Sequence, residues 1–210
     1  MSADFLSDML RGLRLEGVDY GRCRFQAPWG FTFPAQEAAR FHYIAEGGAW
    51  LYTPEREWIE LKAGDAVLIP RGSEHLLSSE PCITCRPFPR WESKRICENI
   101  FDLESGGEGR ATLAFCGSME FNLDPLHPLL RLMPMVMRAH ELMGDEPAIP
   151  HLLDAMGREV AMDRVGAAGI LARLADVLAA AIIRSWVEHG CGDATGWIAA
   201  RANEIIEGGS

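Results

Sequence analysis

The two halves of the chain differ in the spacing of their hydrophobic residues. Up to about residue 123, apolar and polar positions alternate in short runs, and turn residues recur roughly every 8–12 positions, which predicts an all-β barrel or sandwich. We expect strands at 12–18, 21–27, 39–46, 49–52, 57–61, 65–70, 74–79 and 111–116. Glu46-Gly47-Gly48 is typical of a hairpin turn. The stretch 86–109 has no clear period, and we expect a long loop with a short helix near 92–102.

From about residue 125, Leu, Met, Ala, Arg and Glu recur with the roughly 3.6-residue period of a helix. We expect helices at 125–142, 147–161 and 164–189, and short ones near 4–10 and 196–206. The helix 164–189 carries an apolar seam at steps of three and four residues: Ala167, Leu171, Leu174, Leu178, Ala181 and Trp186. Two interpretations stay open: the seam packs on the barrel or the preceding helix, or part of it forms a dimer interface. The domain prediction is a β-barrel over 1–123 and a helical region over 124–210.

Composition narrows the class of protein. At 210 residues and 48% hydrophobic, the chain has apolar material for one large domain, or for one domain with a helical appendage. Its apolar stretches fall short of the roughly 20 residues that a membrane span requires, and its first residues lack the features of a secretory signal. We therefore expect a cytoplasmic location. The net charge of −10 argues against nucleic-acid binding, because that affinity comes largely from Lys and Arg.

The segment 61–75 contains the spacing Gly-x5-Pro-x-Gly-x2-His, from Gly64 to His75. The glycines permit tight turns, and Pro70 ends the strand between them because it has no N–H to donate. His75 then starts the next strand, where its side chain faces the interior. This pattern resembles the second signature motif of cupin β-barrels, a group that includes enzymes, binding modules and sensors. Asp65 is interpreted as a turn former.

The resemblance to the first cupin motif is incomplete. Period-2 alternation in the strand 39–46 places Arg40 and His42 on one face. Relative to Gly47, the position of the metal-binding Glu of cupin enzymes is occupied by Arg40, and the two His positions are occupied by Phe33 and Ala35. A cation at the acidic position argues against the usual iron or manganese site.

Three residues remain as a candidate metal set, namely His42, His75 and Cys116. Their donor types suit zinc and would leave one position open. The alternative is that both histidines are hydrogen-bonded pocket residues and that Cys116 is a small buried apolar group. Cys82-Ile83-Thr84-Cys85 has no second Cys pair at zinc-ribbon spacing, so we interpret it as a strand-edge pair.

Aromatic residues suggest a small-molecule pocket. Trp29, Phe31 and Phe33 alternate, and together with Arg40 and His42 they have the mostly apolar composition of a ligand site. We take Trp29 and Arg40 as the candidate ligand-binding residues. The other interpretation is that the aromatic residues form ordinary barrel core.

An ordered set of short motifs resembles the N-terminal cupin domain of AraC-type transcriptional regulators. The matching segments are 5–10, 13–15, 27–31, 41–47, 64–75, 115–117, 127–130 and 169–176. The resemblance implies a cupin-like double-stranded β-helix barrel followed by a C-terminal helical bundle, and a ligand-sensing, dimerising module that normally precedes two helix-turn-helix motifs. No basic helical region follows residue 200, so we expect this polypeptide not to bind DNA itself. It is either a piece of a longer protein or a stand-alone sensor.

Three functional hypotheses follow. The first is a non-catalytic regulatory domain that binds a small effector, with or without zinc, and forms a homodimer through its C-terminal helices. Effector binding would shift the population of two barrel–helix arrangements. The second is a metal-dependent cupin enzyme of the isomerase or dioxygenase type. The third is a structural dimeric barrel without a ligand.

Overall fold

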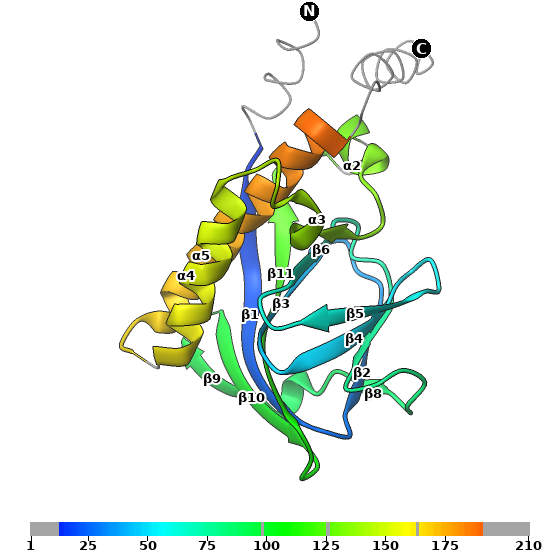
Figure 1. Ribbon diagram of the computed structural model, residues 1–210, viewed down its shortest axis with the longest axis vertical. Helices are drawn as coiled ribbons and strands as arrows, with labels where there is room; N and C mark the ends of the chain where they lie inside the picture. Colours follow the sequence, from blue (N-terminus) through cyan, green and yellow to red (C-terminus); the bar gives the residue numbers. More distant parts are fainter. Residues whose placement is uncertain (1–12, 98, 125–126, 163, 191–210) are drawn as a thin grey trace, which may run out of the picture.

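The computed structural model describes residues 13–97, 99–124, 127–162 and 164–190. The helices expected near 4–10 and 196–206 lie outside these ranges. Two β-sheets face each other, and a pair of helices covers the outer face of the larger sheet (Figure 1). The mainly β plus α prediction is therefore confirmed.

The larger sheet has the strand order β12-β6-β3-β11-β1-β10-β9 and the smaller one β5-β4-β7-β2-β8. The larger sheet contains β1 (Leu15–Gln26), β3 (Ala39–Glu46), β6 (Ala66–Ile69), β9 (Lys94–Cys97), β10 (Ile100–Gly106), β11 (Ala111–Phe121) and β12 (Met137–Arg138). The smaller sheet contains β2 (Gly30–Phe33), β4 (Gly48–Tyr52), β5 (Trp58–Lys62), β7 (His75–Ser78) and β8 (Arg86–Pro87).

Alternation along the strands separates two apolar clusters, one on each face of the larger sheet. In β3, Ile44 belongs to the cluster between the sheets, whereas Phe41 and Tyr43 belong to the cluster shared with the helices. The predicted alternation of this strand is confirmed, and it directs Arg40 and His42 to the barrel interior.

The turn at Glu46-Gly47-Gly48 is not a hairpin. It joins β3 to β4, which lie in different sheets, so the chain crosses here from one layer to the other. Gly47 has a φ of 75°, and a Cβ at this position would lie 2.3 Å from the Ala111 carbonyl oxygen. Both the left-handed backbone and the close approach to β11 require glycine.

The prediction of a helix near 92–102 is wrong. A single turn of 3₁₀ helix, η1 (Arg90–Glu92), is followed by β9 and β10. β10 pairs in parallel with β1, from Tyr20 opposite Ile100 to Gln26 opposite Gly106. The backbone groups of 100–106 are satisfied by a strand distant in the sequence, which local periodicity cannot reveal.

The single helix expected at 125–142 is also wrong. α2 (Pro128–Leu132) ends before Pro134, which cannot continue a helix. The chain then adds β12 to the edge of the larger sheet beside β6, and α3 (Ala139–Leu142) follows. The next two helices, α4 (Ala148–Met162) and α5 (Ala167–Ser185), agree with the expected ranges and are followed by a turn of π-helix, η2 (Trp186–Gly190).

α4 and α5 pack against each other, and α5 packs against β1. Leu171, Leu178 and Ala181 of the α5 seam are buried in the same cluster as Phe115 of the sheet. This part of the seam packs within the chain, as the first interpretation predicted. A separate helical bundle is not confirmed, and the domain boundary at 123/124 stays a prediction. In the described part of the chain no helix is long and apolar enough to span a membrane.

Candidate functional site

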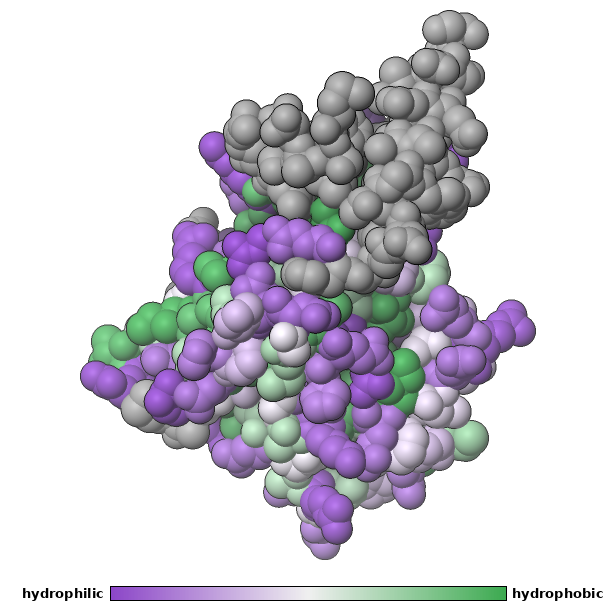
Figure 2. Space-filling view, turned by 45° about the horizontal axis from the view of Figure 1, so that its top comes forward, coloured by the Kyte–Doolittle hydropathy of each residue, from purple (hydrophilic) through white to green (hydrophobic). Residues whose placement is uncertain are grey.

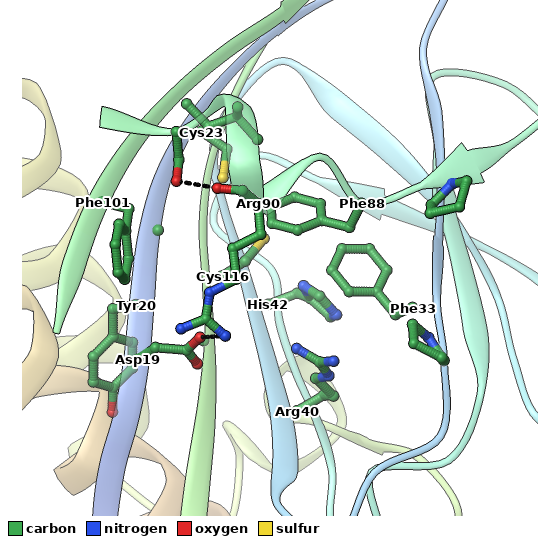
Figure 3. A pocket seen from close by; sticks show the side chains of 16 residues that line it. Asp19, Tyr20, Cys23, Phe33, Arg40, His42, Phe88, Arg90, Phe101 and Cys116 are labelled. Carbon is green, nitrogen blue, oxygen red and sulfur yellow. Dashed lines mark hydrogen bonds and ion pairs between the residues drawn. The ribbon is translucent and has the colours of Figure 1, made fainter. Parts of the chain in front are cut away.

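A cavity of about 280 Å³ lies inside the barrel, where β1, β3 and β11 face η1 and the segment before it (Figure 3). Its walls are mostly apolar and include a small number of charged groups. The lining residues are Asp19, Tyr20, Gly21, Cys23, Phe33, Pro34, Arg40, His42, Pro87, Phe88, Arg90, Ser93, Phe101, Leu103, Cys116 and Gly117. A mostly apolar cavity with a few polar groups has the composition of a small-molecule site.

Local turn chemistry positions His75 behind this cavity. Gly64 has a φ of 94°, and the Asp65 carboxylate accepts the Lys62 N–H at 2.9 Å, which confirms Asp65 as a turn former. Gly72 has a φ of 56°, and a Cβ there would lie 2.2 Å from the Ala38 carbonyl oxygen. These two turns bracket β6, so that His75 begins β7, as the motif predicts.

His42 and His75 form a buried pair whose Nε2 atoms are 2.8 Å apart. His75 Nδ1 lies 2.8 Å from the Ser73 carbonyl oxygen, which can only accept, so Nδ1 carries the proton in neutral His75. Its Nε2 then accepts, and His42 Nε2–H donates. His42 Nδ1 is therefore a bare acceptor, and it has no hydrogen-bond partner among the described residues.

Burial keeps both imidazoles neutral. Desolvation, opposed by the hydrogen bond to Ser73, lowers the pKa of His75 from 6.5 to about 4. The pKa of His42 is lowered well below its ordinary value by desolvation first, and then by the proximity of His75 and Arg40. Phe33 stacks on the His75 ring with centroids 5.0 Å apart, which encloses the pair further.

Arg40 enters the cavity from β3. Its Nη1 donates to Ser118 Oγ at 3.1 Å, and Gln36 Nε2 donates to the same oxygen at 3.1 Å. The guanidinium carbon lies 5.5 Å from the centre of the Phe33 ring. Arg40 Nε is buried and has no partner among the described residues. Burial lowers the pKa of Arg40, which nevertheless stays a cation.

An ion pair lies beside Arg40. Asp19 Oδ2 is 2.6 Å from Arg90 Nη1, which connects β1 to η1. The Arg90 side chain is 59% exposed and the Asp19 side chain 14% exposed, so the pair lies at the edge of the cavity with Arg90 toward solvent. Arg90 also lies over the Phe101 ring at 5.4 Å. Figure 3 shows Asp19 beside Arg90, and Arg40 next to Phe33 and His42 across the cavity from them.

Cys116 is buried beside His42 in the strand register. It lies close to Cys23 on β1, and both thiols line the cavity. A hydrogen bond in which the Cys23 thiol donates to Cys116, together with burial, raises the pKa of Cys23 well above its ordinary value. A buried thiol that stays protonated, like that of Cys23, is typical of a structural rather than a reactive cysteine.

The residues proposed as zinc ligands are only partly brought together. His42 and His75 meet at hydrogen-bonding distance, whereas no group of three or more His, Cys, Asp or Glu side chains in the described ranges is arranged to hold a metal ion. The positions that carry ligands in metal cupins hold Phe33, Ala35 and Arg40 here. These donors do not form a three-ligand site in this arrangement, and zinc at His42, His75 and Cys116 stays a prediction.

Trp29, the other predicted ligand-binding residue, lies apart from Arg40. It is buried against Phe25 and Phe31 and lines a separate surface hollow with Ile83 and Cys85. Asp19, Arg90 and Phe101 also line the cavity and were not predicted from the sequence. The bulge in β1 near Asp19 and the folding of η1 over the barrel have no local sequence signal.

Two tyrosines connect the walls of the cavity to the helices. Tyr20 follows Asp19 in β1, and its hydroxyl donates to Asp176 Oδ1 on α5 at 2.5 Å. Tyr43 follows His42 in β3, and its hydroxyl donates to the Leu153 carbonyl on α4 at 3.1 Å. Consecutive strand residues point to opposite faces. Each strand therefore presents one side chain to the cavity and the next to a helix.

The Tyr20 ring occupies a slot made by two glycines. A Cβ on Gly17 or on Gly117 would lie 2.2 Å from atoms of this ring. The ring also stacks on Phe115 with centroids 5.2 Å apart. The absence of side chains at both positions thus allows the ring to lie flat against the sheet beneath α5.

Comparison with known proteins agrees with this fold. A family model described as cupin matches residues 4–188. The chain is similar to the HTH-type transcriptional regulator AlkR of Acinetobacter baylyi, with 26% identity over 152 residues that cover 67% of this chain and 46% of AlkR. The matched region thus spans less than half of that relative.

Solved structures show weaker similarity. A cupin protein from Bacteroides fragilis is 15% identical, with 57% of this chain and 77% of that chain covered and a TM-score of 0.30. A single-substitution variant of apo ToxT from Vibrio cholerae strain SCE256 is 9% identical, with 78% of this chain and 52% of that chain covered and a TM-score of 0.34. Likenesses at these TM-scores carry no argument about function. On the family match and the sequence relative, the chain belongs to the cupin family, and its resemblance to the N-terminal cupin domain of AraC-type regulators is confirmed.

Proposed function

We propose that this chain is the effector-sensing and dimerisation domain of an AraC-type transcriptional regulator and that it is not an enzyme. A small organic molecule binds in the cavity between β1, β3 and η1. Occupancy changes the relative stability of two arrangements of the barrel and the helices, because the ligand binds one of them more tightly. The similarity to AlkR, a transcriptional regulator, supports the regulatory class.

One observation carries the proposal, namely the pair of tyrosine contacts from the cavity strands to the helices. The Tyr20–Asp176 and Tyr43–Leu153 hydrogen bonds start from residues directly adjacent to Asp19 and His42. A ligand that displaces a cavity side chain also moves the strand backbone beside the tyrosine. Packed interfaces respond to such small shifts by changing between discrete arrangements.

Dimerisation through the C-terminal helices is part of the same proposal. On α5, Ile170 is 48% exposed and Val177 is 54% exposed, and a spacing of seven residues places them on one face of the helix. Figure 2 shows hydrophobic side chains at the edge of the molecule where α4 and α5 lie. This face, rather than the buried seam, is the surface that we assign to the partner subunit.

The test fills the cavity without touching its polar groups. Gly21 lines the cavity, its φ is not positive, and the nearest atom to a Cβ there is Cys23 Sγ at 3.3 Å. Gly21→Val should reduce the space for a ligand at the cost of a small shift of Cys23 Sγ. Gly144→Val is the matched control, because a Cβ at Gly144 meets nothing within 4 Å.

A library of small organic molecules is screened by thermal shift against the parent and both variants. We expect compounds that stabilise the parent and the Gly144→Val control but not Gly21→Val, and that change hydrogen exchange in α5. Equal stabilisation of the parent and Gly21→Val by every compound would contradict binding in this cavity. If the compounds change hydrogen exchange only in the barrel strands, the proposed transmission of ligand binding to the helices is contradicted.

A further inference from the structure

We propose that the ligand of the cavity is a small organic monoanion, a carboxylate on a compact apolar body, whose charged group binds Arg40. This inference rests on the proposed effector function and specifies its ligand class. It is carried by the charges of the cavity wall, by the unused hydrogen-bonding capacity of one guanidinium, and by the shape and polarity of the remaining space.

The cavity wall has an excess of positive charge. Its charged side chains are Asp19, Arg40 and Arg90. Asp19 is paired with Arg90 at 2.6 Å and also raises the pKa of Arg40 electrostatically, against the larger lowering by burial, so one carboxylate faces two guanidinium groups. His42 is buried, donates to His75 from Nε2 and carries no proton on Nδ1, so its neutral ring adds no charge. Arg40 is half-buried and has no ion pair of its own among the described residues, so the cavity wall holds one more cation than anions.

Arg40 has no carboxylate partner in the described part of the chain. Its hydrogen bond goes to a neutral hydroxyl, Ser118 Oγ, and its Nε has no partner. The Nε atom is shielded from water, so its N–H loses hydration without a compensating hydrogen bond. A carboxylate accepts from two guanidinium N–H groups at once, which satisfies both the charge and the free donor.

The guanidinium is held in place before any ligand binds. Ser118 lies directly opposite Arg40 in the register of β3 and β11, and Gln36 donates to the same hydroxyl oxygen. The Phe33 ring supports the guanidinium from another side. Such preorganisation reduces the entropy lost on binding.

The rest of the cavity requires an apolar ligand body. Phe88, Phe101 and Leu103 line it, together with the thiols of Cys23 and Cys116. The volume of about 280 Å³ lies near the lower end of the roughly 300–1,000 Å³ of small-molecule sites, which suits a compact body such as one aromatic ring or a short alkyl chain. Inorganic anions and acetate would leave this apolar space unfilled.

The experiment measures paired probes that differ only in charge. Phenylacetate is compared with phenylacetamide, and hexanoate with hexanamide, by isothermal titration calorimetry at about 0.15 M salt. Acetate and inorganic phosphate serve as anions without an apolar body. The proteins are the parent, Arg40→Gln, and Arg158→Gln as the control, since Arg158 pairs with Asp154 on the exposed surface of α4.

We expect the parent and the Arg158→Gln control to prefer each acid over its amide by roughly tenfold to a hundredfold, the range of a charge-assisted hydrogen bond. Arg40→Gln should lose this preference while amide affinity changes by less than about threefold. Acetate and phosphate should bind at least roughly tenfold more weakly than phenylacetate. Equal binding of acids and amides by the parent, or a preference that survives in Arg40→Gln, would overturn the proposal.

A measurement on the parent covers the case in which Arg40→Gln does not fold. The NMR signal of Arg40 Nε–H, assigned in ¹⁵N-arginine-labelled protein, should shift with phenylacetate and not with phenylacetamide. An unchanged signal at saturating phenylacetate refutes the contact. If only the amides bind, and Gly21→Val blocks their binding, the anion proposal is refuted and the effector pocket is supported. Absence of binding by every probe refutes the anion proposal, whereas the effector pocket itself is tested by the compound library and Gly21→Val.

Discussion

The buried histidine pair makes the stability of the domain depend on pH in a predictable way. Folding places His75 at a pKa of about 4, against an ordinary value of 6.5, and it lowers the pKa of His42 as well. Because the folded pKa lies below the unfolded one, the unfolded chain binds more protons at intermediate pH. The stabilisation is present above about pH 6.5 and is lost as the pH falls toward 4.

The magnitude follows from the His75 shift. Proton binding to the unfolded state at pH 5.0, where folded His75 is still mostly neutral, lowers the free energy of unfolding by about 2 kcal/mol relative to pH 7.5. The full shift of about 2.5 pKa units corresponds to about 3 kcal/mol below pH 4. His42 changes the free energy in the same direction. The side chains of both residues are buried, so solvent screening does not reduce the effect.

The assay is urea unfolding at pH 7.5, 6.5, 5.5 and 5.0, followed by tryptophan fluorescence and circular dichroism. The parent is compared with the double variant His42→Leu/His75→Leu, in which both partners of the hydrogen bond are replaced together so that neither is left unpaired. His151→Ala, at an exposed position of α4, is the control.

We expect the parent and the His151→Ala control to lose at least about 2 kcal/mol between pH 7.5 and 5.0, and the double variant to lose correspondingly less. Parallel pH profiles for the parent and the double variant would refute the reasoning. In that case other groups would carry the acid sensitivity, or the pair would already be protonated in the folded protein.

Three further predictions concern the helices and the metal. Tyr20→Phe removes the hydrogen bond to Asp176 and should lower the free energy of unfolding by about 1.5–3 kcal/mol in urea unfolding, whereas an unchanged midpoint would show that the bond contributes nothing. Elemental analysis of untagged protein purified without chelator tests the zinc hypothesis: near-stoichiometric zinc that disappears in His75→Leu supports it, and a metal-free parent contradicts it. Glutamate at both Ile170 and Val177 should convert a dimer to monomers in analytical ultracentrifugation without a change in melting temperature, and a persistent dimer would place the interface elsewhere.

Several features of the fold follow from local sequence. The turn residues Gly64 and Gly72, with Pro70 between them, determine where β6 begins and ends and therefore where His75 lies. Alternation in β3 determines that Arg40 and His42 share the inner face. The 3.6-residue period predicts α4 and α5. These are properties of a few neighbouring residues, so the sequence alone contains them.

The cavity depends on contacts between segments that are distant in the chain. Asp19 meets Arg90 because β1 passes beneath η1, and Arg40 meets Ser118 because β3 pairs with β11. The strand β10 was not predicted, since its pairing with β1 joins residues about 80 positions apart.

The sequence by itself therefore determined the class of fold, the strand faces and the candidate histidines. The tertiary structure decided which side chains share the cavity, that Trp29 is not among them, and that the α5 seam is internal. The physical reason is that turns and periodicity are set by neighbouring residues, whereas a binding cavity is formed by side chains that only the folded backbone brings together.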